Sequence, residues 1–140
     1  MMTTIFIRTT YLLIITFIFS SVNPQVDKRL IGKWKLVKIV EDTLTMTPPD
    51  SVAFDLIISE STFSYYLGVN TCGFEAKTIK KTIIDTLGFG GLCTEACCDE
   101  WVWKYSTKIN YTGTYELKNR QKILIISNQE SDLYLKRVLK

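Results

Sequence analysis

Apolar and polar residues alternate with a period of two along much of the chain. The segment 52–59 (VAFDLIIS) carries apolar side chains at every second position, namely Val52, Phe54, Leu56 and Ile58. The segment 62–68 repeats the pattern with Phe63, Tyr65 and Leu67. Because successive side chains of a β-strand point to opposite faces, this alternation predicts two strands that each bury one face.

The longest alternation lies in the segment 101–112 (WVWKYSTKINYT). Its odd positions are mostly aromatic or apolar: Trp101, Trp103, Tyr105, Thr107, Ile109 and Tyr111. Its even positions after Val102 are polar. A helix would spread the aromatic side chains around its circumference, whereas a strand places them on one side. We predict a strand over 101–112 whose aromatic side chains face inward.

Shorter segments of the same kind predict the remaining strands, at 32–40, 74–79, 81–87, 112–117, 122–127 and 132–138. Most connections between them are short, and short connections require antiparallel neighbours because parallel pairs need long crossovers. The segment 43–51, with two adjacent prolines, predicts a long loop. Short antiparallel strands hide their edges by closing. The predicted fold is therefore all-β: an antiparallel up-and-down β-barrel of about eight strands.

One strand contains a conflict in its pattern. In the segment 32–40 (GKWKLVKIV), Trp34 and Leu36 share a face with Lys38. A lysine does not belong on a buried face, so we expect a β-bulge or the barrel rim near Val37.

The N-terminus has the pattern of a secretory signal. Arg8 precedes an apolar run over 11–19, which is too short to span a bilayer and suits the hydrophobic region of a signal peptide. We predict a signal peptide at 1–21, a barrel domain at 26–140, and a secreted or periplasmic protein without a membrane span in the mature chain; the alternative is an uncleaved anchor. Removal of Arg8 lowers the formal net charge from +3 to +2, which does not favour nucleic-acid binding.

Residues 32–34 (Gly-Lys-Trp) resemble the Gly-x-Trp that opens the first strand of lipocalins and their calycin relatives. In that family the tryptophan closes the base of the barrel, and a basic residue near the end of the last strand stacks on it. Arg137 is in that position here, so we expect a cation–π contact between Arg137 and Trp34. The resemblance implies a non-enzymatic protein that binds a small hydrophobic ligand inside the barrel.

A second resemblance is to the META domain of bacterial envelope proteins. The segments GVNTCGF and CTEACC look like altered versions of two motifs of that family, with Thr94 and Cys98 at matching positions. The family usually has a helix after the second motif, whereas the pattern of 101–112 predicts a strand. We therefore rank this alternative second. It implies an envelope-stress or protein–protein interaction factor with a filled core, acting through the loop 88–100, where Phe89 and Leu92 would be presented to a partner.

Four cysteines, Cys72, Cys93, Cys97 and Cys98, are expected to form disulfides in an oxidising compartment. A bond between the adjacent Cys97 and Cys98 would be strained. Two pairings remain open, Cys72–Cys98 with Cys93–Cys97 or Cys72–Cys97 with Cys93–Cys98. The alternatives are a metal site and a redox dithiol, but the spacing lacks the C-x-x-C pairs typical of both.

The residue types argue against catalysis. The chain has no histidine, which excludes Ser-His and Cys-His nucleophilic pairs and any histidine-ligated metal. The carboxylates that remain as acid–base candidates all fall at positions typical of a solvated rim: Asp55, Glu60, Asp85, Asp99 and Glu100. We expect no enzymatic activity, no cofactor and no metal.

The aromatic side chains on the predicted inward faces are the candidate ligand contacts. Together with the two residues of the lipocalin resemblance, the expected ligand-binding residues are Trp34, Phe54, Phe63, Tyr65, Trp103, Tyr105, Tyr115 and Arg137. Affinity for a small apolar ligand would come from burial of its surface. The alternative is that these side chains fill the interior of a barrel of this size and leave no cavity.

Overall fold

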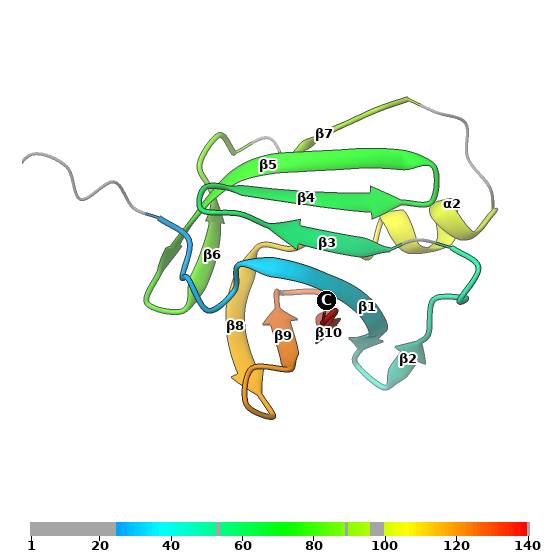
Figure 1. Cartoon of the computed structure of the whole chain (residues 1–140). Helices are drawn as coiled ribbons and strands as arrows, with labels where there is room; N and C mark the ends of the chain where they lie inside the picture. Colours follow the sequence, from blue (N-terminus) through cyan, green and yellow to red (C-terminus); the bar gives the residue numbers. More distant parts are fainter. Residues whose placement is uncertain (1–24, 53, 89, 96–99, 140) are drawn as a thin grey trace, which may run out of the picture.

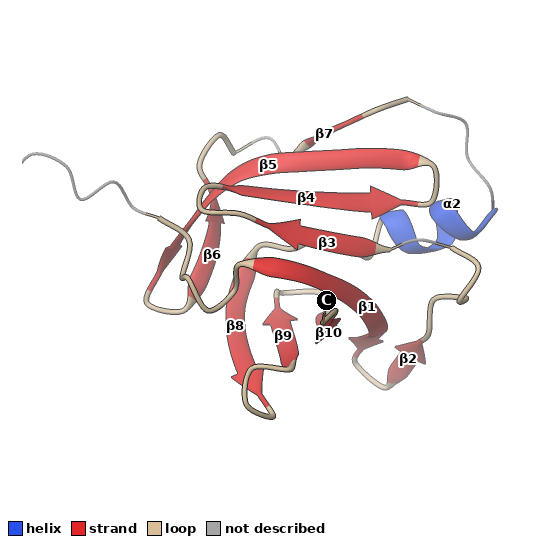
Figure 2. Cartoon of the chain, viewed as in Figure 1, coloured by secondary structure: helices blue, strands red, loops and turns tan. Residues whose placement is uncertain are grey.

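The computed structural model describes residues 25–139 except 53, 89 and 96–99, and does not describe the side chain of Trp101. The predicted signal peptide, Phe89, Cys97 and Cys98 lie outside the described residues. Within the described part, strands make up most of the ordered structure and one short helix accompanies them (Figures 1 and 2). The elements are β1 (Gly32–Glu41), β2 (Leu44–Met46), β3 (Asp55–Ile58), β4 (Thr62–Leu67), β5 (Asn70–Ile79), β6 (Thr82–Asp85), β7 (Leu92–Cys93), α2 (Glu100–Ser106), β8 (Gly113–Lys118), β9 (Ile123–Ser127) and β10 (Asp132–Arg137).

The sheet closes into a barrel. Each strand pairs antiparallel with the next in the order β1, β3, β4, β5, β6, β8, β9, β10, and β10 returns to pair with β1. β2 pairs with the end of β1 and β7 with β5, so both are additions to the closed ring. The predicted antiparallel barrel is confirmed, and β2 forms a short strand inside the segment predicted as a loop. Closure removes the free edges of the ring.

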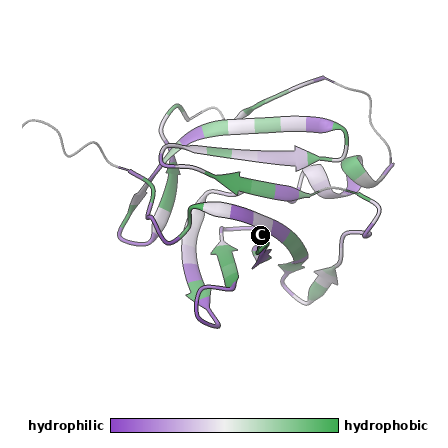
Figure 3. Cartoon of the chain, viewed as in Figure 1, coloured by the Kyte–Doolittle hydropathy of each residue, from purple (hydrophilic) through white to green (hydrophobic). Residues whose placement is uncertain are grey.

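The barrel interior is filled with apolar side chains. Figure 3 shows hydrophobic and hydrophilic residues alternating along β5, as expected of a strand with one buried face. The predicted inward faces of 52–59 and 62–68 are confirmed, since Phe54, Phe63 and Tyr65 are all buried. Aromatic rings from different segments of the chain meet inside: Phe63 stacks on Phe74 at 5.3 Å, and Tyr65 meets Tyr111 edge-on at 5.0 Å between ring centroids.

The conflict in the first strand is resolved by a bulge, as predicted. Trp34 pairs with Arg137 and Leu36 with Leu135, but the register with β10 shifts between Leu36 and Lys38. The extra residue allows Leu36 and Ile39 both to point inward, while Val37 is exposed and Lys38 is partly exposed. Lys38 lies over the ring of Tyr134 at 4.3 Å.

The predicted strand over 101–112 is wrong, because its first half is the helix α2. Val102 and Tyr105 lie three residues apart, so the helix brings both onto its buried face. Trp103 is 67 % exposed, and its predicted inward orientation is therefore also wrong. A Cβ on Gly68 would lie 2.6 Å from Val102 Cγ2, which shows how closely the helix packs on the β4–β5 turn. The Tyr105 hydroxyl donates to the Thr47 carbonyl at 2.9 Å.

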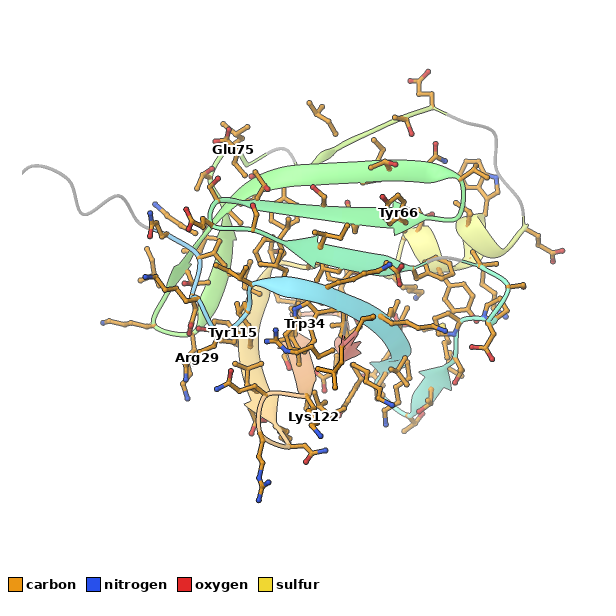
Figure 4. All side chains as sticks on the ribbon, in the orientation of Figure 1. Arg29, Trp34, Tyr66, Glu75, Tyr115 and Lys122 are labelled. Atoms are coloured by element: carbon orange, nitrogen blue, oxygen red, sulfur yellow. A yellow bond between two sulfur atoms is a disulfide. The ribbon has the colours of Figure 1, made fainter. Side chains whose placement is uncertain are left out.

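Trp34 and Arg137 close one end of the barrel. The indole of Trp34 is fully buried, and its Nε1 donates to the Leu30 carbonyl at 2.7 Å. The guanidinium of Arg137 lies 4.2 Å from the Trp34 ring, which confirms the expected cation–π contact. Arg137 also donates from Nη1 to the Ile31 carbonyl and from Nε to the Gln121 carbonyl, both at 3.0 Å. Figure 4 shows Trp34 beneath β1.

Gly32 explains the first residue of the Gly-Lys-Trp segment. Its φ is +137°, a conformation that residues with a side chain rarely adopt, and a Cβ there would lie 3.0 Å from Arg137 Nη1. The glycine therefore allows the guanidinium to approach the backbone at the base.

A hydrogen bond from Tyr115 to Asp27 fixes the N-terminal segment to β8, next to an ion pair within that segment. The Asp27 carboxylate accepts hydrogen bonds from Arg29 and from the Tyr115 hydroxyl, the latter at 2.6 Å. The hydrogen bonds from Arg29 hold the pKa of Asp27 well below its usual range. Burial, followed by the bond to Asp27, raises the pKa of Tyr115 to about 12. Figure 4 shows Arg29 and Tyr115 close to each other, so the Tyr115 hydroxyl is engaged with the N-terminal segment.

A disulfide joins Cys72 of β5 to Cys93 of β7. Both pairings expected from the sequence are therefore wrong, because each assigned Cys72 to Cys97 or Cys98. Cys72 and Cys93 are directly opposite in the antiparallel register, with their Cα atoms 4.0 Å apart, within the reach of a disulfide. Since these two sulfurs are bonded to each other, the alternative site of four thiolates around a metal is not formed in this structure.

Substitution of Arg137 tests the base. Arg137→Ala removes the ring contact and leaves the backbone carbonyls of Arg29, Ile31 and Gln121 without this donor, so we expect the free energy of unfolding to fall by about 2–3 kcal/mol. Arg137→Lys keeps the charge but loses the planar guanidinium, and its free energy of unfolding should lie between those of Arg137→Ala and wild type. Lys136→Ala, at the exposed neighbouring position, should stay within about 0.5 kcal/mol of wild type. Urea denaturation measures all three; equal stability of the two alanine variants would contradict this account.

Peptide mapping tests the disulfide. Under non-reducing conditions, cleavage after Glu95 separates Cys93 from Cys97 and Cys98, so mass spectrometry should detect a Cys72 peptide linked to the Cys93 peptide. A Cys72 peptide linked to Cys97 or Cys98 would refute the pairing. Replacing Cys72 and Cys93 together by serine should lower the free energy of unfolding by about 3 kcal/mol, because the bond closes a loop with a sequence separation of 21 residues.

Candidate functional site

A pocket of about 260 Å³ lies where β6 and β8 part from each other. The two strands pair only through Thr82 with Thr114 and Ile83 with Gly113, because the chain between them leaves the ring to form β7 and α2. We call this hollow the β6–β8 pocket. Its described lining residues are Tyr65, Phe74, Asp85, Gly88, Gly90, Ile109, Asn110, Tyr111 and Thr112.

The loop after β6 forms one wall of the pocket, and Asp85 holds its shape. The two carboxylate oxygens of Asp85 accept hydrogen bonds from the backbone N–H groups of Leu87 at 2.9 Å and Gly90 at 2.8 Å. Gly91 has a φ of +97°, and a Cβ there would lie 3.0 Å from the Gly73 carbonyl oxygen. The loop therefore approaches β5 more closely than a residue with a side chain would allow.

The disulfide anchors the far end of this wall. Cys93 is bonded to Cys72, whose neighbour in the β4 register is Tyr65 of the pocket. Thr94 extends the connection, since its backbone N–H donates to the Thr71 carbonyl at 3.0 Å. Figure 1 shows β7 running along the outer edge of β5. Cross-linking and backbone pairing together fix the loop against the barrel.

The hydroxyl of Tyr111, a residue that lines the pocket, is an unusual group because it is covered by the surrounding protein. Tyr111 is 2 % exposed, and its hydroxyl has no hydrogen-bond partner among the described residues. Burial raises the pKa of this hydroxyl far above its ordinary value, so it is a neutral O–H at physiological pH. A buried polar atom without a partner costs about 1–3 kcal/mol, and such groups call for an explanation in a native structure.

Asp85 brings a negative charge into an otherwise neutral lining. It is directly opposite Ala76 in the β5–β6 register, and Ala76 is buried, so the Asp85 side chain is on the interior side of the sheet. It is the one charged residue in the described lining. Burial, followed by the charge of Asp85, raises the pKa of the Tyr65 hydroxyl.

Only Tyr65 of the predicted ligand-binding residues lines this pocket. Trp34 and Arg137 form the base, Phe63 is in the core, Tyr105 packs from α2 and Tyr115 bonds to Asp27. Trp103 is exposed, and Phe54 lies beside a different hollow. The residues that the prediction missed are Phe74, Asp85, Ile109 and Tyr111. Ile109 and Tyr111 were on the predicted inward face of 101–112, which indicated their burial but not their function.

The second hollow, of about 300 Å³, lies between β1 and the 47–52 loop next to Phe54. Lys35 lines it and forms an ion pair with the fully exposed Asp50 at 3.3 Å. Exposed ion pairs of this kind contribute little to the stability of a protein. Its described lining contains no buried polar group without a partner, so the β6–β8 pocket is the stronger candidate.

The loop 88–100, the predicted protein-binding surface, is described only in part. Leu92 is 80 % exposed, as that alternative requires. Phe89 and residues 96–99 lie outside the described residues.

Comparisons with known proteins bear on the fold. No protein-family model and no curated protein sequence matches the chain. A solved structure of a protein from Burkholderia xenovorans matches with a TM-score of 0.60 and 15 % identity, over 86 % of this chain and 95 % of that one. A lipocalin-like protein from Bacteroides uniformis ATCC 8492 matches with a TM-score of 0.52 and 14 % identity, over 79 % of this chain and 99 % of that one. The fold is lipocalin-like.

The META resemblance is not tested by these structures. The strand that placed it second is in fact the helix α2, which follows the second motif as that family's helix does. The lipocalin-like barrel stands on its closed sheet and on the second structural match. Across the residues that the structure describes, no helix has the length and apolar character needed to cross a bilayer.

Replacement of Tyr111 by phenylalanine tests whether its hydroxyl is unpaired. Tyr111→Phe removes a buried polar atom without removing a bond, so the free energy of unfolding of the ligand-free protein should stay equal or rise by about 1 kcal/mol. Tyr105→Phe is the matched control: it breaks the bond to the Thr47 carbonyl and should cost about 1 kcal/mol. Urea denaturation compares the two. A loss for Tyr111→Phe as large as that of Tyr105→Phe would mean that the hydroxyl has a partner.

Proposed function

We propose that this protein is a non-enzymatic, extracytoplasmic, lipocalin-like protein that binds a small, largely apolar molecule in the β6–β8 pocket. The observation that carries the proposal is the buried Tyr111 hydroxyl, which lacks a partner within the described residues and belongs to a lining that also contains Tyr65, Phe74 and Ile109. Ligand sites commonly combine an apolar lining with a few polar groups that orient the ligand. Tyr111 would supply such a group to a ligand that displaces the side chains covering its hydroxyl.

The pocket dimensions favour a small ligand. Drug-sized ligands occupy clefts of about 300–1,000 Å³. The β6–β8 pocket, at about 260 Å³, suits one ring or a short chain. Phe74 and Ile109 supply apolar contact area, and Tyr65 adds an aromatic face.

The filled core favours ligand binding in the β6–β8 pocket over binding along the barrel axis. Phe63, Phe74 and Tyr65 pack against one another inside the ring, with centroid distances of 5.3 and 6.5 Å. Four of the seven aromatic residues expected to contact ligand therefore pack against other aromatic rings: Phe54, Phe63, Tyr65 and Tyr105. The ligand would enter at the side, where β6 and β8 separate.

The disulfide supports an oxidising compartment. Bonds of this kind persist outside the cytoplasm and are rare within it. The Cys72–Cys93 bond and the lipocalin-like fold are compatible with export, for which the apolar segment within 1–21 would serve as the signal. The site residues proposed here do not require catalysis, since binding needs only burial and orientation.

Ligand binding is tested on the purified mature protein. Mass spectrometry of an organic extract of the denatured protein should detect a small co-purified molecule. In a titration with benzyl alcohol, a neutral single-ring probe, amide signals of Gly90, Ile109 and Thr112 should shift in NMR spectra, while Gly32 at the base should not. A clean extract together with no shift at the pocket would refute the proposal.

A matched pair of variants locates the site. Thr112 lines the pocket, so Thr112→Trp should obstruct it and weaken benzyl alcohol binding at least tenfold. Thr114→Trp makes the same change two residues away, at an exposed position of β8, and should bind as wild type does. Equal affinity of the two variants would place the ligand elsewhere.

A further inference from the structure

We propose that the β6–β8 pocket selects ligands that carry an ammonium group on a small apolar body, with Asp85 as the residue that determines this charge preference. The inference rests on the proposed function and names its ligand class. It follows from three properties of the described lining residues: a single charged group, a set of aromatic rings, and a covered hydroxyl that can accept a hydrogen bond.

The charge of the lining comes from Asp85 alone among its described residues. Solvent-exposed carboxylates at the rim of a barrel are ordinary, but this one is on the interior side of the sheet, opposite the buried Ala76. Its field extends into the pocket, since it contributes to the raised pKa of the Tyr65 hydroxyl. No lysine or arginine belongs to the described lining, so an anionic ligand would meet repulsion without compensation.

The aromatic side chains favour the same sign of charge. Tyr65 lies 5.0 Å from Tyr111 and 6.5 Å from Phe74 between ring centroids, each pair in an edge-to-face arrangement, so the three rings present differently oriented faces. The faces of aromatic rings attract cations within about 6 Å of the ring centroid. A cation in this pocket would thus have aromatic neighbours as well as a carboxylate.

The Tyr111 hydroxyl fits an ammonium donor. An ammonium group carries only N–H donors, and a hydroxyl oxygen has lone pairs that accept them. Burial keeps this hydroxyl in its neutral form, so it can accept from the ligand without adding a second negative charge. An amine whose ammonium group displaces the side chains covering this oxygen would therefore give it the partner that the described residues do not supply.

Asp85 also has a structural task, which the test must separate from charge selection. Its bonds to the Leu87 and Gly90 N–H groups shape the loop that walls the pocket, so Asp85→Asn can loosen the wall as well as remove the charge. A looser wall lowers the affinity for every ligand, whereas loss of the charge lowers only the affinity for a cationic ligand. The ratio of affinities for a charged and a neutral probe of the same shape is thus the informative measurement.

Three single-ring probes form the test: benzylammonium, benzyl alcohol and benzoate. NMR titration of the mature wild-type protein at low ionic strength should give an affinity for benzylammonium about tenfold higher than for benzyl alcohol, with benzoate the weakest. In Asp85→Asn the ratio of the first two should approach one. Asp50→Asn, at a fully exposed carboxylate outside this pocket, should keep the wild-type ratio.

The possible results distinguish the charge preference from ligand binding itself. If benzyl alcohol or benzoate binds the pocket as tightly as benzylammonium, the charge preference is refuted while ligand binding stands. If Asp85→Asn keeps the tenfold ratio, Asp85 is not the selective residue. If none of the probes shifts signals at the pocket and the extract is clean, both the charge preference and the proposed function fail. If Asp85→Asn does not fold, the wild-type ranking and its weakening by salt decide, because attraction between partly exposed charges is screened.

Discussion

The pairing of β1 with β10 closes the sheet, and the contact between Trp34 and Arg137 seals that junction at its base. A closed ring has no edge to protect, and its inward side chains have a single volume to fill. Arg137 serves both needs, because its guanidinium covers the indole and its N–H groups satisfy backbone carbonyls of segments that would otherwise end without donors. The positive φ of Gly32 makes room for this arrangement.

Strong closure at one junction allows weak pairing at another. β1 and β10 share six register pairs, whereas β6 and β8 share two, and the chain between β6 and β8 forms the loop wall, β7 and α2. The pocket exists because this junction is short. Its wall is secured by other means, namely the hydrogen bonds of Asp85 and the Cys72–Cys93 bond. The barrel can therefore tolerate the Tyr111 hydroxyl, which has no partner among the described residues, because its stability comes mainly from the filled core.

Features of the fold that depend on the local sequence pattern could be predicted, whereas features that depend on the register between strands were missed. Alternation identified the strands around Phe54 and Phe63, and the misplaced Lys38 identified the bulge in β1. The helix α2 was predicted as a strand because its aromatic residues alternate with other residues. The three-residue spacing of Val102 and Tyr105, which suits a helix, lies within the same alternating segment. The disulfide was missed because only the strand register shows that Cys72 faces Cys93. Tyr111 was expected to be buried, but a missing partner is visible only in three dimensions.

The charge at the pocket has a physical basis in the same topology. β6 is four residues long, and its inward face alternates Ile83 with Asp85, so the carboxylate occupies the last inward position before the chain turns away. At the preceding inward position, Ile83, such a charge would be buried against apolar side chains at a cost of several kcal/mol. At the end of β6 it is partly solvated and holds the loop through two backbone bonds, and this position allows its field to act on a ligand. The proposed charge preference would therefore come from the same carboxylate that orders the wall, because both follow from its place at the end of a short strand.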